Sequence, residues 1–235
     1  MNITVISTGS EKGNSYLVED GHTSILLDAG ASIEAIKKAV DFDVTRISAA
    51  LVTHEHGDHS RSADKLLFYG VDIYASNGTL TMIGLEDSVH AQTVKSMRPE
   101  KIGTFRVVPF VVEHDAAEPL GFVVDSIVTG ERLLYFTDTA YVRYLFPRVD
   151  VILGECNHSS DILEANAASG RIAPELAARI TKNHMSLERL LVYLGMMDKT
   201  KLKKVVMIHA SDANADDELF LSRVRAATGL EVEIA

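Results

Sequence analysis

Several residue types are scarce in this chain of 235 residues, which has one cysteine, Cys156, five prolines and no tryptophan. A single cysteine excludes an intrachain disulfide framework and favours a reducing compartment. The few prolines provide no proline-rich linker between domains. No apolar run reaches the ~18 residues that a membrane span needs, and residues 1–10 indicate a strand and a loop rather than a signal peptide. We therefore expect a cytoplasmic protein without a membrane partner.

Positive charge is also in deficit. The chain has 23 Lys and Arg against 33 Asp and Glu, a formal net charge of −10. This balance disfavours a broadly basic nucleic-acid binder, although a clustered basic patch stays compatible with it. The hydrophobic fraction of 46% and the charged fraction of 24% are ordinary for a globular protein. The length fits a single domain over residues 1–235.

Hydrophobic patterning predicts an α/β protein in which strand-rich and helical stretches alternate. We expect strands at 3–7, 15–19, 24–27, 49–53, 71–75, 104–112, 121–128, 132–136, 151–155, 204–208 and 231–234. We expect helices at 33–40, 60–69, 174–182, 186–198 and 213–227, with a mixture of helix and loop over 76–98. Two β-sheets with helices covering their outer faces would satisfy this order.

The strongest chemical signal is a cluster of His54, His56, Asp58 and His59, which directly follows a short apolar strand. Imidazole and carboxylate groups are ligands for zinc, manganese or iron. Gly57 is expected to let the loop bend. Grouped histidines beside carboxylates are costly without compensation, so the cluster indicates a site rather than a solvated polar loop.

The pattern His54-x-His56-x-Asp58-His59 resembles the signature motif of the metallo-β-lactamase superfamily. The resemblance implies the metallo-β-lactamase αββα four-layer sandwich, with metals at one edge of the two sheets. It also implies three further ligands, each at the end of an apolar strand: His114, Asp138 and His209.

The resemblance implies two divalent metal ions, Zn²⁺ or Mn²⁺, with iron also acceptable to these ligands. One ion would take His54, His56, His114 and Asp138. The other would take Asp58, His59, His209 and Asp138. Such a pair leaves an open position for a bridging water and can clamp a phosphoryl group. Cys156 matches no ligand position of the motif.

The segment Thr8–Ser15 resembles the opening of the YycJ/WalJ exonuclease branch of this superfamily, which is related to ribonuclease Z-like phosphodiesterases. The resemblance extends from Ile3 to about Ser211 and implies metal-dependent DNA exonuclease activity. This sequence departs from the branch at Ser159, where Asp is usual, and at Leu187, where Asn is usual. Both departures lie on the expected substrate side.

Three residues are candidates for catalysis. Asp58 would hold a metal and orient the nucleophile. His184 matches the histidine that related phosphodiesterases place beside the scissile phosphate, where it could protonate the leaving oxygen; the alternative is a polar residue at a helix start. His158 could act in the same way or orient a ligand.

Basic residues outside this cluster are candidates for contact with a phosphate backbone. A solvated surface turn is the alternative for the lysines. These substrate-binding candidates are Lys199, Lys201, Lys203, Lys204 and Arg143.

The leading interpretation is a phosphodiesterase acting on nucleic acid, a DNA or RNA exonuclease. The first alternative is a phosphodiesterase for small nucleotides, including cyclic ones, which the acidic net charge favours. A thioester or lactone hydrolase is a second alternative, and His184 weighs against it. A metal-stabilised scaffold without activity is the non-enzymatic reading. A homodimer is expected only because two-fold assemblies are common.

Overall fold

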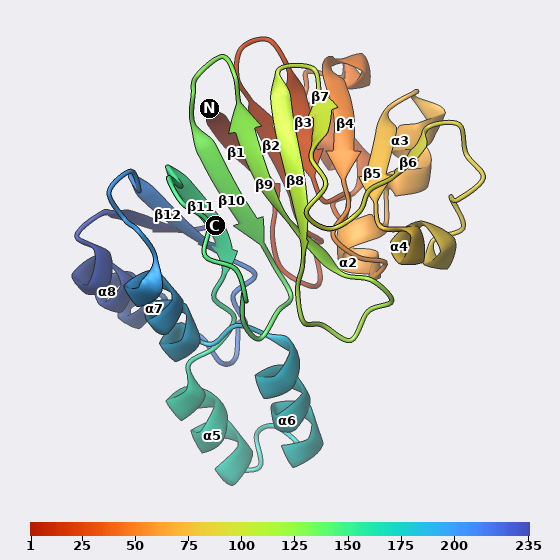
Figure 1. Ribbon diagram of the computed structural model, residues 1–235. Helices are drawn as coiled ribbons and strands as arrows, with labels where there is room; N and C mark the ends of the chain where they lie inside the picture. Colours follow the sequence, from red (N-terminus) through yellow and green to blue (C-terminus); the bar gives the residue numbers. More distant parts are fainter. The chain divides into compact units, whose positions relative to one another are not determined.

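The computed structural model describes residues 1–235. The chain forms two compact units (Figure 1). The first unit comprises Met1–Val111 with Ala116–Glu131, and the second comprises Val112–Asp115 with Arg132–Ala235. The expectation of one domain over the whole chain stays a prediction.

A six-stranded sheet with the order β1-β2-β3-β4-β5-β6 dominates the first unit. Its strands are β1 (Asn2–Ser7), β2 (Ser15–Glu19), β3 (Ser24–Leu27), β4 (Ile47–Leu51), β5 (Asp72–Ala75) and β6 (Ala91–Thr93). The first three pair antiparallel, and β3 to β6 pair parallel. Apolar side chains such as Leu26, Ile36 and Ile73 form a fully buried core against this sheet, and burial of this kind is the main favourable term in folding.

Short helices accompany this sheet. They are α1 (Ile33–Ala39), the 3₁₀ turn η1 (Val44–Arg46), α2 (Gly57–Ser60), α3 (Ala63–Phe68) and α4 (Asn77–Met82). The Ser32 side chain caps α1 by accepting a hydrogen bond from the backbone N–H of Ala35.

Three antiparallel strands complete the first unit: β7 (Glu100–Ile102), β8 (Phe105–Val111) and β9 (Leu120–Ser126). The carboxylate of Asp20, in the turn between β2 and β3, links the six-stranded sheet to these three strands. Its Oδ2 atom accepts hydrogen bonds from the hydroxyl groups of Thr104 and Ser126, both at 2.7 Å. One buried carboxylate thus ties together three strand ends that are distant in sequence.

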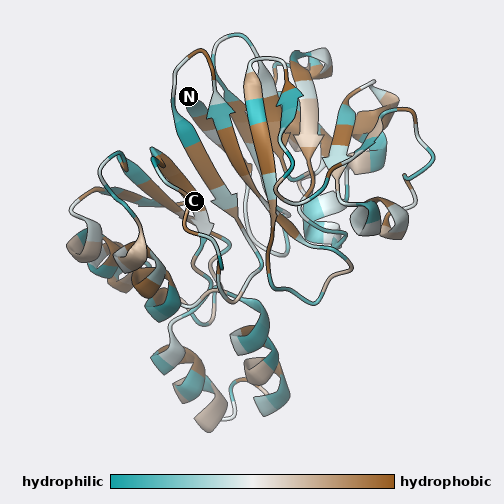
Figure 2. Cartoon of the chain, in the orientation of Figure 1, coloured by the Kyte–Doolittle hydropathy of each residue, from teal (hydrophilic) through white to brown (hydrophobic).

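The second unit contains four parallel strands, β10 (Arg132–Phe136), β11 (Val151–Glu155), β12 (Lys204–Ile208) and β13 (Glu231–Ile234). Apolar residues dominate the strands of this sheet (Figure 2). Parallel strands end at the same edge, so the residues that follow β10, β11 and β12 are brought together there. The functional side chains of this unit lie at that edge.

Four helices complete the second unit: α5 (Ser160–Ala168), α6 (Pro174–Asn183), α7 (Leu187–Met196) and α8 (Asp217–Thr228). Helices α5 and α6 contact each other, as do α7 and α8 (Figure 1). No helix of the chain is both long and apolar enough to cross a membrane.

The observed elements differ from the sequence expectation in several places. The helix expected over 60–69 is split into α2 and α3, because the backbone N–H of Ser62 donates to the carbonyl of Ala29 at 2.8 Å rather than to a carbonyl of the preceding turn. Helix α5 was not predicted, since only Leu163 and Asn166 on it are buried and its apolar periodicity is weak. The three-residue strands β6 and β7 are too short to carry a periodic signal.

Candidate metal centre and active site

The first unit carries one half of the expected ligand set, at the carboxyl end of β4. This first half-site consists of His54, His56, Asp58 and His59. The ring centroid of His54 lies 4.7 Å from that of His56 and 4.3 Å from that of His59. Helix α2 begins at Gly57, directly after His56. The four residues predicted from the motif are therefore brought together.

The loop that carries this half-site bends at Glu55 and His56, directly before Gly57, which starts α2 without a left-handed φ. Asp28, which follows β3, has a left-handed φ of 56°. A left-handed conformation is unfavourable for a residue with a side chain and often marks a functional position.

Asp28 is a functional residue that sequence reasoning missed, and it is fully buried. Its Oδ2 atom accepts a hydrogen bond from His59 Nδ1 at 2.7 Å. Its Oδ1 atom accepts one from the backbone N–H of Thr53 at 2.8 Å. The Thr53 hydroxyl in turn lies 3.0 Å from His54 Nδ1. These contacts fix the Nδ1 side of both rings and direct Nε2 outward as the ligand atom.

Asn14, on the loop before β2, is a second missed residue. Its Nδ2 atom lies 3.1 Å from His59 Nε2 and 3.3 Å from the carbonyl oxygen of Asp58. The backbone N–H of Asn14 also donates to that carbonyl at 2.7 Å. Only glycine fits at position 30, because a Cβ atom there would lie 1.7 Å from the same oxygen. Tight backbone packing thus positions the ligands of α2.

The second unit carries the other expected ligands, His114, Asp138 and His209. Together with the catalytic candidate His184 they form a second half-site. Asp138 and His209 follow β10 and β12 and have left-handed φ values of 45° and 56°. Asp138 Oδ2 lies 3.6 Å from His114 Nε2, and Asp138 Oδ1 lies 3.4 Å from His209 Nδ1. The ends of the parallel strands β10 and β12 therefore bring Asp138 and His209 together, and His114 lies beside Asp138.

Glu155, the last residue of β11, organises the second half-site and was also missed. It is fully buried, and its Oε1 atom accepts hydrogen bonds from His184 Nδ1 at 2.6 Å and His209 Nδ1 at 3.0 Å. Its Oε2 atom accepts from the backbone N–H groups of Thr139 at 2.9 Å and Met185 at 3.0 Å. Four donors occupy this carboxylate, so it positions both imidazoles and does not serve as a metal ligand.

Glu155 and His184 each favour the charged form of the other. Burial alone would raise the pKa of Glu155, but its contacts with His184 and His209 outweigh burial and lower it. Burial alone would lower the pKa of His184, but the charge and hydrogen bond of Glu155 raise it. The hydrogen bond to Glu155 engages Nδ1 of the His184 ring, so Nε2 is the ring nitrogen available for proton transfer.

The pKa values of His114 and His158 shift in the opposite direction from that of His184. Burial lowers the pKa of His114, and its Nδ1 atom faces the carbonyl of Asn183 at 3.4 Å, so a neutral ring presents Nε2 as a ligand. Burial lowers the pKa of His158 to about 4, and its Nδ1 atom is buried without a hydrogen-bond partner. A ring that is neutral near pH 7 is a poor proton donor, and the catalytic role of His158 stays a prediction.

The candidates for substrate contact are placed away from the ligands or are engaged in ion pairs. Arg143 pairs with Glu113 and lies 5.7 Å from the centroid of the Tyr141 ring. Lys203 pairs with Asp150 at 3.1 Å.

The other lysines lie at the start of β12, whereas His209 follows its end. Lys199 donates to the carbonyl of Leu194 at 2.8 Å, and Lys204 pairs with Glu233 at 2.8 Å. Lys201 is exposed. Backbone binding by Arg143 and the four lysines stays a prediction.

The donor atoms fit divalent metal ions. Each half-site offers imidazole nitrogens together with a carboxylate, and the Nδ1 atoms of His54, His59 and His114 each face an oxygen atom. This arrangement leaves Nε2 to coordinate, as is usual for metal-binding histidines. Neither half-site supplies a thiolate, since Cys156 is buried and burial raises the pKa of its thiol well above its usual range.

Comparison with known proteins places this arrangement in a family. Residues 8–168 match the Metallo-beta-lactamase superfamily. The chain is 27% identical over 234 residues to "Exodeoxyribonuclease WalJ" of Streptococcus pneumoniae, covering 92% of this chain and 84% of that protein. It is 27% identical over 233 residues to "Exodeoxyribonuclease YycJ" of Bacillus anthracis, covering 93% of this chain and 86% of that protein.

A solved structure agrees. The metallo-β-lactamase fold protein YhfI of Bacillus subtilis superposes with a TM-score of 0.76 at 17% identity, covering 99% of this chain and 95% of that one. The chain belongs to the metallo-β-lactamase superfamily, which confirms the predicted fold class. This membership and the groups of His and Asp side chains described above identify the chain as a metal-dependent hydrolase.

Proposed function

We propose that this protein is a metal-dependent phosphodiesterase that degrades DNA from a chain end. One observation carries the proposal: a buried carboxylate, Glu155, accepts a hydrogen bond from His184 Nδ1 at 2.6 Å, within one group of side chains that also contains the expected ligands Asp138 and His209. A proton donor beside a metal ligand set suits cleavage of a phosphodiester, whose leaving oxygen needs a proton. Two relatives named exodeoxyribonuclease, matching more than nine-tenths of this chain, support DNA as substrate.

We propose two metal ions, Zn²⁺ or Mn²⁺, with ligands assigned from the sequence motif. One set is His54, His56, His114 and Asp138, and the other is Asp58, His59, His209 and Asp138. When bound, the ions would supply an activated water and neutralise the charge that develops on the phosphoryl group.

The protein's own residues would position the ligands, orient the nucleophile and protonate the leaving oxygen. Asp28 and Thr53 hold His59 and His54 in the tautomers that coordination requires. Asp58, beside His59 Nε2 at 3.3 Å, would orient the nucleophile. His184 would donate its Nε2 proton to the leaving oxygen, and Glu155 would stabilise the imidazolium before transfer.

A small-nucleotide phosphodiesterase is the second candidate, because the net charge of −10 disfavours a long electrostatic contact with a polymer. An ester, thioester or lactone hydrolase fits less well, since its chemistry does not require the hydrogen-bonded His184–Glu155 pair. A homodimer and a cytoplasmic location stay predictions.

Hydrolysis by the metal-reconstituted protein tests the proposal. The substrates are end-labelled single- and double-stranded DNA, RNA, cyclic nucleotides and bis(p-nitrophenyl) phosphate, with Zn²⁺ and Mn²⁺ tested separately. We expect stepwise shortening of DNA from one end and its loss in Asp138→Ala. Turnover of cyclic nucleotides with every polymer intact would assign the protein to the second candidate. The variant His184→Gln should lose at least about 100-fold in kcat while keeping its metals.

A further inference from the structure

An apolar pocket of about 450 Å³ adjoins the second half-site. We call it the α7 pocket. The residues that line it are Tyr141, Val142, Met185, Glu188, Arg189, Val192, Tyr193 and Met196. Its volume lies within the range of small-molecule sites, about 300–1,000 Å³. The mechanism described above does not use it.

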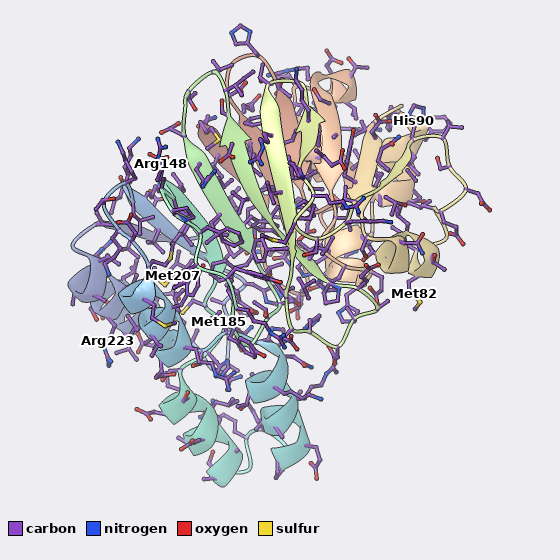
Figure 3. The ribbon with its side chains drawn as sticks, in the orientation of Figure 1. Met82, His90, Arg148, Met185, Met207 and Arg223 are labelled. Carbon is purple, nitrogen blue, oxygen red and sulfur yellow. The ribbon has the colours of Figure 1, made fainter.

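The walls of the α7 pocket are joined to the second half-site by short, direct connections. Met185 follows His184 in the chain, and Figure 3 labels it where the chain enters α7. Tyr141 lies three residues after Asp138, and its carbonyl accepts a hydrogen bond from the Thr139 hydroxyl at 2.8 Å. The carboxylate of Glu155 binds the N–H groups of both Met185 and Thr139. The same carboxylate that holds His184 therefore fixes both walls.

The surface that the α7 pocket offers is aromatic and aliphatic. The exposed fractions of Tyr141, Val192 and Met196 are 44%, 61% and 57%. The two charged residues in the lining are already engaged. Glu188 accepts hydrogen bonds from the N–H and hydroxyl groups of Ser160 at 3.2 and 2.7 Å, and Arg189 donates to the carbonyl of Thr181 at 2.7 Å. The pocket can therefore take a flat apolar group but has little capacity to read its polar edge.

We propose that the α7 pocket stacks a nucleobase next to the scissile phosphate, with Tyr141 as the stacking platform. This inference rests on the proposed nuclease function. Stacking on an aromatic ring accepts every base, because each has a π-face, so the subsite gives affinity without sequence selection. A second copy of the chain is a weaker fit, since a stable interface needs about 20–30 residues from each side, against the eight that line this pocket.

The test compares normal and abasic DNA in metal-loaded wild type, Tyr141→Ala, Tyr141→Phe and Tyr144→Ala. Tyr144 is a matched control, because it lies on the same loop but outside the pocket. Two readouts are used: KM and kcat for end-labelled DNA, and the Kd of a fluorescent phosphorothioate oligonucleotide that resists cleavage. Each substrate is made with and without an abasic site in its terminal nucleotides.

We expect Tyr141→Ala to raise KM and Kd for normal DNA about tenfold with kcat little changed, and Tyr141→Phe and Tyr144→Ala to match wild type. An abasic terminus should raise the KM and Kd of the wild-type protein by a similar factor. It should not raise those of Tyr141→Ala any further. The inference would be overturned if Tyr141→Ala lost affinity equally for normal and abasic DNA, or lost no affinity for either. It would also be overturned by a Tyr141→Ala variant that converts a dimer to a monomer and treats both substrates alike, because that would assign the pocket to a second copy.

The two proposals fail separately. If wild type binds normal DNA more tightly than abasic DNA through Tyr141 but hydrolyses neither, the nuclease assignment is wrong and the base subsite stands. If wild type degrades normal and abasic DNA equally well, the nuclease assignment stands and the base subsite is wrong.

Discussion

At the scale of single residues, buried carboxylates organise this protein, and each acts through hydrogen bonds to groups that are distant in sequence. Asp28 orients His59, and Glu155 orients His184 and His209. Asp20 has a purely structural task, since it joins the β2–β3 turn to the ends of β8 and β9. Buried charged groups persist only where such partners compensate their lost hydration.

Replacement of Asp28 tests how far the ligand geometry depends on a residue that does not coordinate. Asp28→Asn removes the carboxylate that accepts the Nδ1 proton of His59. We expect metal affinity to fall about 10- to 100-fold, measured by competition with a chromophoric chelator. Asp125→Asn, at an ion pair with the half-exposed Arg106, is the control. Unchanged affinity in Asp28→Asn would show that the ligands hold their geometry without it.

The Asp20 carboxylate gives a prediction about pH. Burial alone would raise its pKa, but hydrogen bonds from Thr104, Thr23, Ser126 and His22 outweigh burial and lower the pKa from 3.8 to about 2. A depressed carboxyl pKa contributes stability that is complete above pH 3.8 and is lost as the pH falls through about 2.

Asp20→Asn should therefore reduce the free energy of unfolding at pH 7 by about 2 kcal/mol. The difference from wild type should shrink as the pH is lowered from 4 toward 2. Urea unfolding across this pH range measures both effects. Asp41→Asn, at an exposed ion pair with Arg46, should change stability by no more than about 0.5 kcal/mol. A pH-independent loss in Asp20→Asn would contradict the electrostatic explanation.

At the scale of elements, the end of β3 and the helix α2 meet through backbone rather than side chains. A Cβ atom at Gly30 would lie 1.7 Å from the carbonyl oxygen of Asp58, so α2 would have to move. We expect Gly30→Ala to lower the free energy of unfolding by about 3 kcal/mol and to weaken metal binding as well. Gly195→Ala, where a Cβ atom meets nothing within 4 Å inside α7, should be neutral or stabilising. Thermal unfolding and metal content are measured for both variants. Equal stability and metal content in the two would contradict the prediction.

At the scale of the whole molecule, the proposed metal ligands come from segments far apart in the chain, from His54 to His209. Metal binding should therefore stabilise the folded chain relative to the unfolded one. We expect the metal-loaded protein to unfold in one calorimetric transition at a higher Tm than the protein treated with a chelator. The chelated protein should unfold at lower temperature and less cooperatively. Loss of metal that leaves the transition unchanged would contradict the proposed ligand sets.

The sequence alone determined most strand positions, apart from β6 and β7, because these depend on local periodicity. The fold class and the full set of expected ligands came from the resemblance of a compact motif to a known family. The helices α1, α6, α7 and α8 were predicted from local periodicity. Helix α5 was not, since it buries too few apolar residues to show a period.

Tertiary structure alone decided the partners of those ligands. Glu155 contacts residues 29 and 54 positions away, and Asp28 contacts one 31 positions away. No local pattern encodes such pairs, which arise because parallel strands end at a common edge. Local sequence thus identified the atoms able to bind metal, whereas the packing of distant strands selected the carboxylates that orient them and formed the pocket beside them.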